Sequence, residues 1–314
     1  MIEGIVLNMK IDYDVIIVGA GAAGLSAAIY TCRAQLNTLV LEQLAPGGQI
    51  NITAEVENYP GFPDGILGPE LSQRMHSQAI RFGAKIITDE AVKLELEKPI
   101  KVVQGNDNSY SAKAIILTAG GAHNKLEVPG EDEFSGRGVS YCATCDANFF
   151  KGQDVIVIGG GDAAIDEGLY LTRIVNSVTV IHRRDQLRAS PVLQQRAFDT
   201  SNMSFKWSHA VREIRGNGNV DRVLLENLKD GSLYEHSTNG AFIYVGYHPN
   251  SNFALEAVET DFGGHILTDI KMRTNIEGVF AAGDVRQHSF RQLGEAVGDG
   301  ITAAMSTYEY LSEF

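Results

Sequence analysis

The sequence predicts an α/β fold in which a nucleotide-binding unit occurs twice. A short apolar run ending at Gly19 leads into a glycine-rich turn and a helical pattern of small residues, and the same arrangement returns at Gly159. Gly159 follows Gly19 by 140 residues, and His182 follows Glu42 by the same interval. Two copies in register indicate two dinucleotide sites, and 314 residues are enough for about two domains.

Composition narrows the classes of partner. Hydrophobic residues make up 44% of the chain and 33 residues are glycine, which is typical of soluble α/β proteins with many tight turns. A net charge of −13 favours neither nucleic acid nor an anionic membrane as partner. Residues 1–10 lack a basic leader followed by an apolar run, and no later stretch has the ~20 apolar residues of a membrane span, so we expect a cytoplasmic protein.

The first glycine turn has the spacing G-x-G-x-x-G, formed by Gly19, Gly21 and Gly24. Without side chains, the backbone approaches a pyrophosphate closely at the start of the following helix. Glu42 ends the next strand, 18 residues after Gly24. A carboxylate at that place accepts the ribose hydroxyls of an adenosine and repels a 2′-phosphate.

The second turn has the form G-x-G-x-x-A, from Gly159 through Gly161 to Ala164. After the second strand of this unit, arginines stand where the first unit has the acidic residue Glu42. Their guanidinium groups suit the 2′-phosphate of NADP, although a solvated basic turn has the same sequence pattern. The basic segment consists of His182, Arg183, Arg184 and Arg188.

The remaining elements follow from periodicity and turn residues. We expect a helix over 69–82 and an antiparallel ribbon over 85–104. A buried strand at 114–119 and a last strand at 278–285 are expected to join the first sheet. The second unit is expected to contain a helix starting at Ser190 and Pro191, a hairpin turn at 216–219 and a strand at 242–246, and the chain to end in a helix over 291–311.

Two of the three cysteines, Cys142 and Cys145, are separated by two residues and followed by Asp146. Such a pair can cycle between dithiol and disulfide if one thiol has a lowered pKa. Half of a zinc site and an inert buried pair share the same spacing. An odd number of cysteines argues against a structural disulfide framework, and we interpret Cys32 as a buried core thiol. We propose no metal site.

Taken together, the motifs closely resemble those of the low-molecular-weight thioredoxin reductases. They cover nearly the whole chain: Gly19–Gly24, Gly48 and Gln49, Glu57–Gly61, Val128–Glu131, Cys142–Asp146, Gly159–Ala164, His182–Arg188, Ala281–Asp284, and Arg291 with Gln292. The resemblance implies two Rossmann-like domains of the three-layer ββα type, the second inserted into the first. We expect an FAD-binding domain at 1–126 plus 250–314 and an NADPH-binding domain at 127–249.

The resemblance also implies the cofactor contacts. The expected FAD contacts are Gly19, Gly21, Ala22, Ala23, Gly24, Glu42, Gly48, Gln49, Asn58, Gly283, Asp284, Arg291, Gln292 and Leu293. The expected NADPH contacts are Gly159, Gly161, Asp162, Ala163, Ala164, His182, Arg183, Arg184 and Arg188. Leu293 and the two residues after it depart from the more apolar run usual in the family, and Asp166 and Gly168 stand where Glu and Ala are expected.

The resemblance further implies a thioredoxin-disulfide reductase, in which electrons pass from NADPH through FAD to the cysteine pair and then to thioredoxin. Cys145 is expected to meet the flavin and Cys142 to attack the partner. Asp146 is expected to handle protons with a pKa raised by partial burial, and its alternative role is to cap the following helix. One domain is expected to rotate against the other between half-reactions, and the protein to be a homodimer.

Three alternatives remain at the level of sequence. In the first alternative, the enzyme reduces a disulfide other than that of thioredoxin, in a peroxiredoxin, a glutaredoxin-like protein or a small molecule. In the second alternative, the electron donor is ferredoxin or NADH in place of NADPH. The arginines that suit a 2′-phosphate argue against this donor. In the third alternative, the chain binds flavin without turnover.

Overall fold

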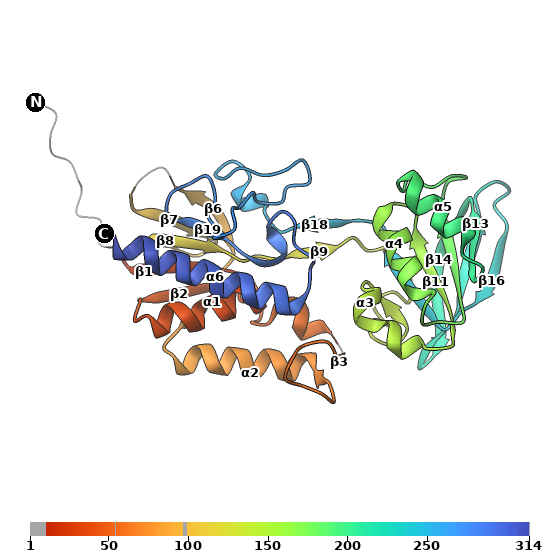
Figure 1. The fold of residues 1–314 in the computed structure, drawn as a ribbon, viewed down its shortest axis with the longest axis horizontal. Coiled ribbons are helices and arrows are strands. Elements are labelled where there is room, and N and C mark those ends of the chain that lie inside the picture. Colours follow the sequence, from red (N-terminus) through yellow and green to blue (C-terminus); the bar gives the residue numbers. More distant parts are fainter. Residues whose placement is uncertain (1–10, 54, 97–98, 314) are drawn as a thin grey trace, which may run out of the picture. The chain divides into compact units, whose positions relative to one another are not determined.

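The computed structural model describes residues 11–53, 55–96 and 99–313. Its residues form two compact units, one made of the two ends of the chain and the other of residues 123–247 (Figure 1). The first unit covers residues 1–122 and 248–314. The expectation about an export leader rests on residues 1–10, which lie outside the described residues.

The first unit is built on a mixed sheet whose central, parallel strands are nearly continuous apolar runs. Val15 to Ile17 and Ile115 to Leu117 are fully buried, as expected for strands covered on both faces. The sheet has the order β5-β2-β1-β8-β7-β6, and β19 also pairs with β8. Its strands are β1 (Tyr13–Val18), β2 (Thr38–Glu42), β5 (Lys85–Thr88), β6 (Ala91–Glu95), β7 (Lys101–Gly105), β8 (Ser109–Leu117) and β19 (Val279–Ala281).

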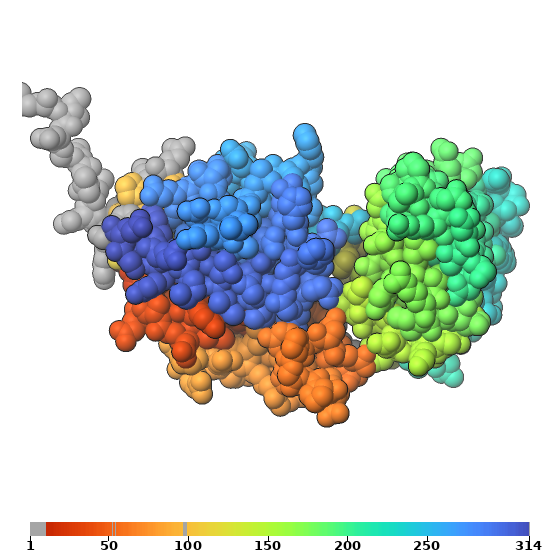
Figure 2. Space-filling model, viewed as in Figure 1, coloured from red at the N-terminus to blue at the C-terminus, as the bar shows by residue number. Residues whose placement is uncertain are grey.

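Helices cover one face of this sheet and the β6–β7 ribbon contributes to the core on the other. The helical core joins α1 (Ala22–Arg33), α2 (Gly68–Arg81) and α6 (Leu293–Ser312). In Figure 2 the blue C-terminal segments lie directly against the red N-terminal ones in this unit. The unit's short elements are η1 (Gly48–Ile52), β3 (Glu55–Val56), β4 (Ile66–Leu67), η3 (Asn252–Ala254) and η4 (Gly283–Val285).

The second unit repeats this layering. All neighbouring strands of its main sheet run parallel, in the order β10-β17-β11-β12-β13. The helical face carries α3 (Ala143–Asp146), α4 (Asp162–Leu171) and α5 (Pro191–Asp199), and the other packs against an antiparallel meander. The strands are β10 (Val139–Ser140), β11 (Asp154–Gly159), β12 (Ser177–His182), β13 (Met203–Trp207), β17 (Gly240–Tyr244) and the meander β14 (His209–Asn217), β15 (Asn219–Asn227) and β16 (Leu233–Ser237); η2 (Ala147–Phe150) follows α3.

The chain passes between the units through β9 (Gly121–His123) and β18 (Tyr247–Pro249), which pair with each other. In the part of the chain that the structure describes, no helix is long and apolar enough to cross a membrane.

Most predicted elements are confirmed, and three are corrected. The expected antiparallel ribbon over 85–104 is wrong at its start, because β5 pairs parallel with β2 and only β6 and β7 form a ribbon. The expected strand over 278–285 stops at Ala281, where the backbone turns into η4. The last helix begins at Leu293, since Arg291 has a left-handed φ of 57°.

Candidate functional site

The first glycine turn allows contacts that side chains would prevent. A Cβ on Gly24 would lie 1.9 Å from the carbonyl oxygen of Gly19, whereas one on Gly21 would meet no atom within 4 Å. Gly24 therefore lets α1 approach β1, and Gly21 leaves open space at the helix start. This cradle suits a pyrophosphate, which the free amides and positive end of α1 would bind.

Glu42 lies beside this turn. One of its carboxylate oxygens accepts a hydrogen bond from the Ala20 amide at 2.7 Å, and the other accepts one from the Leu44 amide at 3.2 Å. These bonds hold the carboxylate at the carboxyl end of β2, beside the phosphate cradle. The position fits a group that accepts ribose hydroxyls.

The other residues expected to contact FAD come from three segments of the first unit. Gln49 donates from Nε2 to the Gly121 carbonyl oxygen at 3.2 Å, and Asn58 donates from Nδ2 to Oε1 of Gln292 at 3.3 Å. A Cβ on Gly48 would lie 3.2 Å from the Cα of Gly21. The structure therefore brings Gly48 to the glycine turn and joins Asn58 to Gln292.

Gly283 and Asp284 lie in η4, beside the first turn of α6. A Cβ on Gly283 would approach the Cβ of Ala23 to 3.0 Å, so η4 packs closely on α1. Burial raises the pKa of Asp284, against a hydrogen bond from Ser289. Leu293 begins α6 and packs against the helical core.

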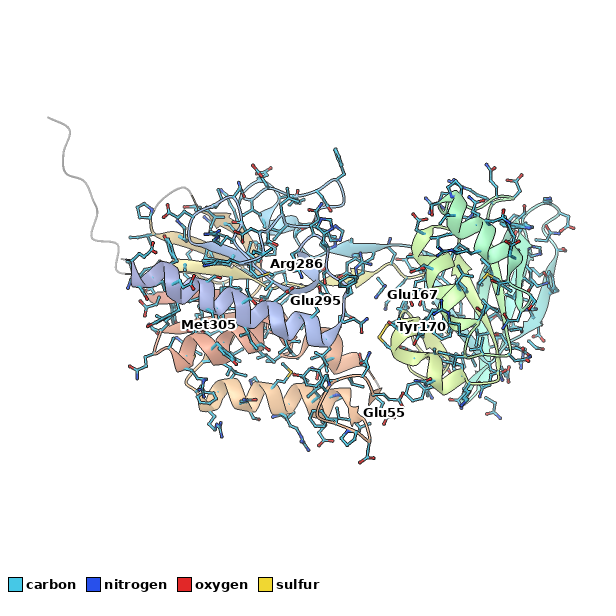
Figure 3. The ribbon with its side chains drawn as sticks, viewed as in Figure 1. Glu55, Glu167, Tyr170, Arg286, Glu295 and Met305 are labelled. Carbon is cyan, nitrogen blue, oxygen red and sulfur yellow. A yellow bond between two sulfur atoms is a disulfide. The ribbon has the colours of Figure 1, made fainter. Side chains whose placement is uncertain are left out.

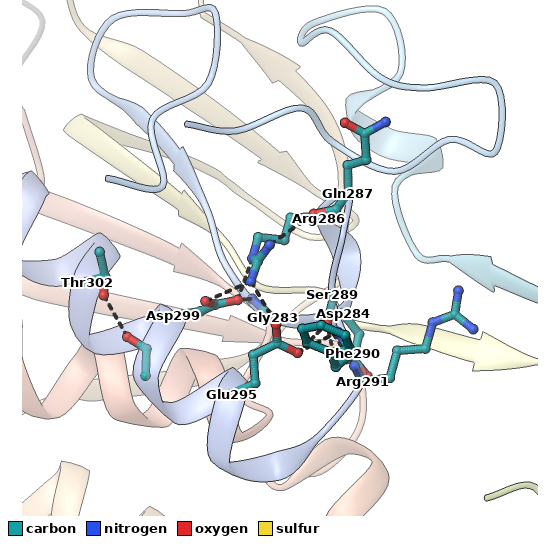
Figure 4. Close-up of polar contacts among 11 residues, drawn as sticks. Gly283, Asp284, Arg286, Gln287, Ser289, Phe290, Arg291, Glu295, Asp299 and Thr302 are labelled. Atoms are coloured by element: carbon teal, nitrogen blue, oxygen red, sulfur yellow. Dashed lines mark hydrogen bonds and ion pairs between the residues drawn. The ribbon is translucent and has the colours of Figure 1, made fainter. Parts of the chain in front are cut away.

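A buried ion-pair network, which sequence analysis missed, holds this region together (Figure 4). Arg286 donates to both carboxylate oxygens of Asp299, at 2.5 and 3.0 Å, and to Glu295 at 3.0 Å. Asp299 also accepts the Gly283 amide at 3.0 Å, and Glu295 accepts the Phe290 amide at 2.6 Å. The network thereby fixes η4 and the loop that leads to Arg291.

In the second unit, the glycine turn is built in the same way but backed by an imidazole ring. A Cβ on Gly160 would lie 2.3 Å from Cε1 of His182, which is 5% exposed. Burial and then the charges of Arg188, Arg184 and Arg183 lower the pKa of His182. A neutral ring packed beneath the turn supports the turn, and its Nε2 has no hydrogen-bond partner among the described residues.

The arginines lie where the chain returns to this turn. The amide of Arg188 donates to the Gly160 carbonyl oxygen at 2.7 Å, and the Ser190 amide donates to Asp162 at 2.6 Å. Arg183, Arg184 and Arg188 all have exposed side chains. Gly161 precedes α4, and Asp162, Ala163 and Ala164 form its first turn. This basic edge matches the chemistry of a 2′-phosphate.

The cysteine pair forms a disulfide on the same unit, between Cys142 and Cys145. Asp146 accepts a hydrogen bond from the Ser140 hydroxyl at 2.6 Å, and that hydroxyl accepts the Cys142 amide at 3.1 Å. The alternative role of Asp146 as a helix cap is wrong, because its side chain makes no capping bond to η2. Within residues 11–53, 55–96 and 99–313, no three His, Cys, Asp or Glu side chains are grouped as a metal site requires.

Comparison with known proteins decides the family. The pyridine nucleotide-disulphide oxidoreductase family matches residues 13–300. The chain belongs to this family. It is 49% identical over 302 residues to a thioredoxin reductase of Bacillus subtilis, covering 96% of this chain and 95% of that protein. A thioredoxin reductase of Listeria innocua is 50% identical over 302 residues, covering 96% and 94%.

A solved thioredoxin reductase of Streptococcus pyogenes has the same fold as the present chain. Its TM-score is 0.94 at 47% identity, covering 96% of this chain and 99% of that one. The predicted resemblance and the predicted fold class of two Rossmann-like domains are therefore confirmed.

Sequence analysis overlooked several residues that this family member uses to shape its sites. Thr118 donates from its hydroxyl to the Gly19 carbonyl oxygen at 2.9 Å, behind the first turn. Glu167 and Tyr244 contact the turn of residues 142–146 that carries the disulfide, which we call the redox turn. For the ion-pair network, the sequence offered one sign only: Glu295 and Asp299 are two acidic residues one helical turn apart. Cys32 is only partly buried, and burial raises the pKa of its thiol.

Proposed function

We infer that the chain is an NADPH-dependent thioredoxin-disulfide reductase that uses FAD. The disulfide of Cys142 and Cys145 carries this inference, because it stands on the unit with the basic glycine turn in a chain similar over its whole length to thioredoxin reductases. Both cradles have the open glycine and the close backbone approach that dinucleotides require.

We assign FAD to the unit formed by the chain ends. Glu42, whose carboxylate the Ala20 amide holds at the end of β2, would accept ribose hydroxyls, and Asp284 and the 291–293 segment near the start of α6 would contribute further contacts. When bound, FAD would accept a hydride and deliver two electrons to a disulfide. The domain bounds expected above, 1–126 with 250–314 and 127–249, belong to this proposal.

We assign NADPH to the other unit, with Arg183, Arg184 and Arg188 as candidates for the 2′-phosphate. The disulfide would receive two electrons and two protons, and the resulting dithiol would reduce the disulfide of thioredoxin and become a disulfide again. We propose that Cys145 is the sulfur that meets the flavin, that Cys142 attacks the partner, and that Asp146 moves the proton. Ser140, which bonds both Asp146 and the Cys142 amide, holds that carboxylate beside the pair.

Three further features belong to the proposal. One unit would rotate against the other, because the redox pair and the NADPH turn belong to the same unit. A reducing compartment, the cytoplasm, fits a disulfide that turns over. The homodimer is expected from the family resemblance, and light scattering of the purified protein tests it.

The decisive experiment is an anaerobic titration of the purified protein with NADPH and, separately, with NADH, following flavin absorbance. NADPH should bleach the flavin at far lower concentration, and addition of thioredoxin with insulin should give continuous turnover. Cys145→Ser should keep flavin reduction and lose turnover. Flavin that stays oxidised with NADPH contradicts the donor, and a Cys145→Ser protein still active on thioredoxin contradicts the relay.

A further inference from the structure

The partly buried side chains of Glu167 and Tyr244 meet the backbone amide of Ala143 in the redox turn. The Ala143 amide donates to Oε2 of Glu167 at 3.1 Å and to the Tyr244 hydroxyl at 2.7 Å. That hydroxyl in turn lies 3.3 Å from the same carboxylate oxygen and donates to it. Figure 3 labels Glu167 on α4, beside the turn that carries the yellow disulfide bond.

Both side chains belong to regular elements of the nucleotide-binding unit and not to the loop that carries the cysteines. Glu167 lies on α4, which starts at the second glycine turn, and Tyr244 ends β17, the neighbour of β11. Ala143, which is fully buried, follows Cys142 directly. The turn is therefore anchored at the Ala143 amide to two rigid elements of the unit.

Three amides of the turn donate hydrogen bonds while the disulfide is formed. The Ala143 amide bonds to Glu167 and Tyr244, and the Cys145 amide donates to the Cys142 sulfur at 3.2 Å. The Asp146 amide donates to the Cys142 carbonyl oxygen at 3.1 Å. Glu167 therefore places a carboxylate at the amide that directly follows Cys142, where it acts on any charge that the Cys142 sulfur acquires.

We propose that Glu167 is a positioning residue for the redox pair: it fixes the turn through the Ala143 amide, and its negative charge raises the proton affinity of the Cys142 thiol. This inference rests on the proposed function, because it requires a pair that cycles. On reduction, two electrons break the S–S bond and the two sulfurs take up two protons. A neighbouring negative charge disfavours thiolate and so favours that uptake.

Charges around Glu167 are arranged consistently with this role. Burial raises the pKa of Glu167, against hydrogen bonds from Ala143, Tyr244 and Thr144. Burial, followed by the charge of Glu167, raises the pKa of Tyr244 far above its usual value, so that its hydroxyl stays protonated and donates. The other charged groups on the elements around it are Asp162 and Asp166 on α4, Asp146 on the redox turn, and Arg173, Arg196 and Asp199 along the adjoining groove.

The test measures the pH dependence of thiol alkylation in the full-length protein after reduction with dithiothreitol. Iodoacetamide modification of each cysteine is followed by peptide mass spectrometry from pH 5 to 10, which separates Cys142 from Cys145 and Cys32. Glu167→Gln keeps the shape and removes the charge. Its Cys142 midpoint should fall by about 0.5–1 pH unit, so that the rate at pH 6.5 rises by about 3–10-fold while the plateau at high pH is unchanged.

Two variants separate charge from positioning. Asp166→Asn removes a neighbouring exposed charge with no bond to the Ala143 amide, and should leave the midpoint within about 0.2 unit. Tyr244→Phe keeps the charge but removes one acceptor, so amide exchange at Ala143 should accelerate without a fall in the midpoint. An unshifted Glu167→Gln midpoint, or an equal shift in Asp166→Asn, overturns the inference. Because neither flavin nor thioredoxin takes part, failure of the proposed function would appear separately, as absent turnover in the unaltered protein.

Discussion

Replacing Arg286 with Met should open the segment between η4 and α6 selectively. The Arg286, Glu295 and Asp299 side chains are 13%, 19% and 8% exposed, and the substitution leaves the buried carboxylate of Asp299 and the partly buried one of Glu295 without their cation. Breaking a buried pair by removing one partner costs about 3–5 kcal/mol. Glu295 retains some solvent, so we expect a value of about 3 kcal/mol, which is more than hundredfold in a local opening equilibrium.

Hydrogen exchange of the purified protein measures this opening directly. The Gly283 and Phe290 amides donate to Asp299 and Glu295, so their protection reports on the network itself. The matched control is Lys271→Met, which removes a cation from an exposed pair with Glu309, whose side chains are 51% and 60% exposed. This control should cost less than about 1 kcal/mol.

The comparison has a clear refuting result. If Gly283 and Phe290 stay as protected in Arg286→Met as in Lys271→Met, the network does not hold this segment. Adding Asp299→Asn to Arg286→Met removes an uncompensated charge and should restore part of the protection. A double variant less protected than the single one contradicts the electrostatic cause.

Two other predictions concern the first unit. Gly24→Ala should lower the melting temperature of flavin-free protein, because the new Cβ would clash with the Gly19 carbonyl oxygen. Gly21→Ala should keep that melting temperature but lose flavin on gel filtration, because its Cβ would meet no protein atom. Equal effects of the two variants on both properties would contradict these separate roles. Asp89 is buried, which opposes its ionised form, but hydrogen bonds from Tyr110 and the amides of residues 106–108 outweigh this and lower its pKa. Because the folded pKa lies below the unfolded one, its stabilisation should be present above about pH 4 and vanish as pH falls through the folded pKa. Urea unfolding of the Asp89→Asn variant should differ from the parent at pH 7 and converge with it at about pH 2–3; a difference constant with pH would rule this out.

Local patterns in the chain were enough to predict the repeated unit. The strands β1 and β11 are apolar runs that end in glycine turns, so both nucleotide turns could be read from adjacent residues. Glu42 and the arginines after β12 follow the same logic, because each ends the second strand of its unit. The cysteine pair was found by spacing alone, and only the surrounding motifs favoured redox chemistry over zinc.

Pairing partners were harder to predict, because strand direction depends on residues far away in the chain. The segment 85–88 alternates weakly like a ribbon strand but pairs parallel with β2, since α2 carries the chain back across the sheet. In the same way, η4 replaces the end of an expected strand because Gly283 must pack against Ala23 on α1.

The sequence by itself determined the number of nucleotide turns, the acid and the arginines that distinguish them, and the residues of the redox pair. These are properties of short segments, set by backbone sterics and side-chain chemistry. Only the tertiary structure decided which groups surround these segments: Arg286 between Glu295 and Asp299, His182 beneath Gly160, and Glu167 with Tyr244 at the Ala143 amide. Such contacts join residues that are brought together by sheet order and helix packing, and no local pattern encodes them.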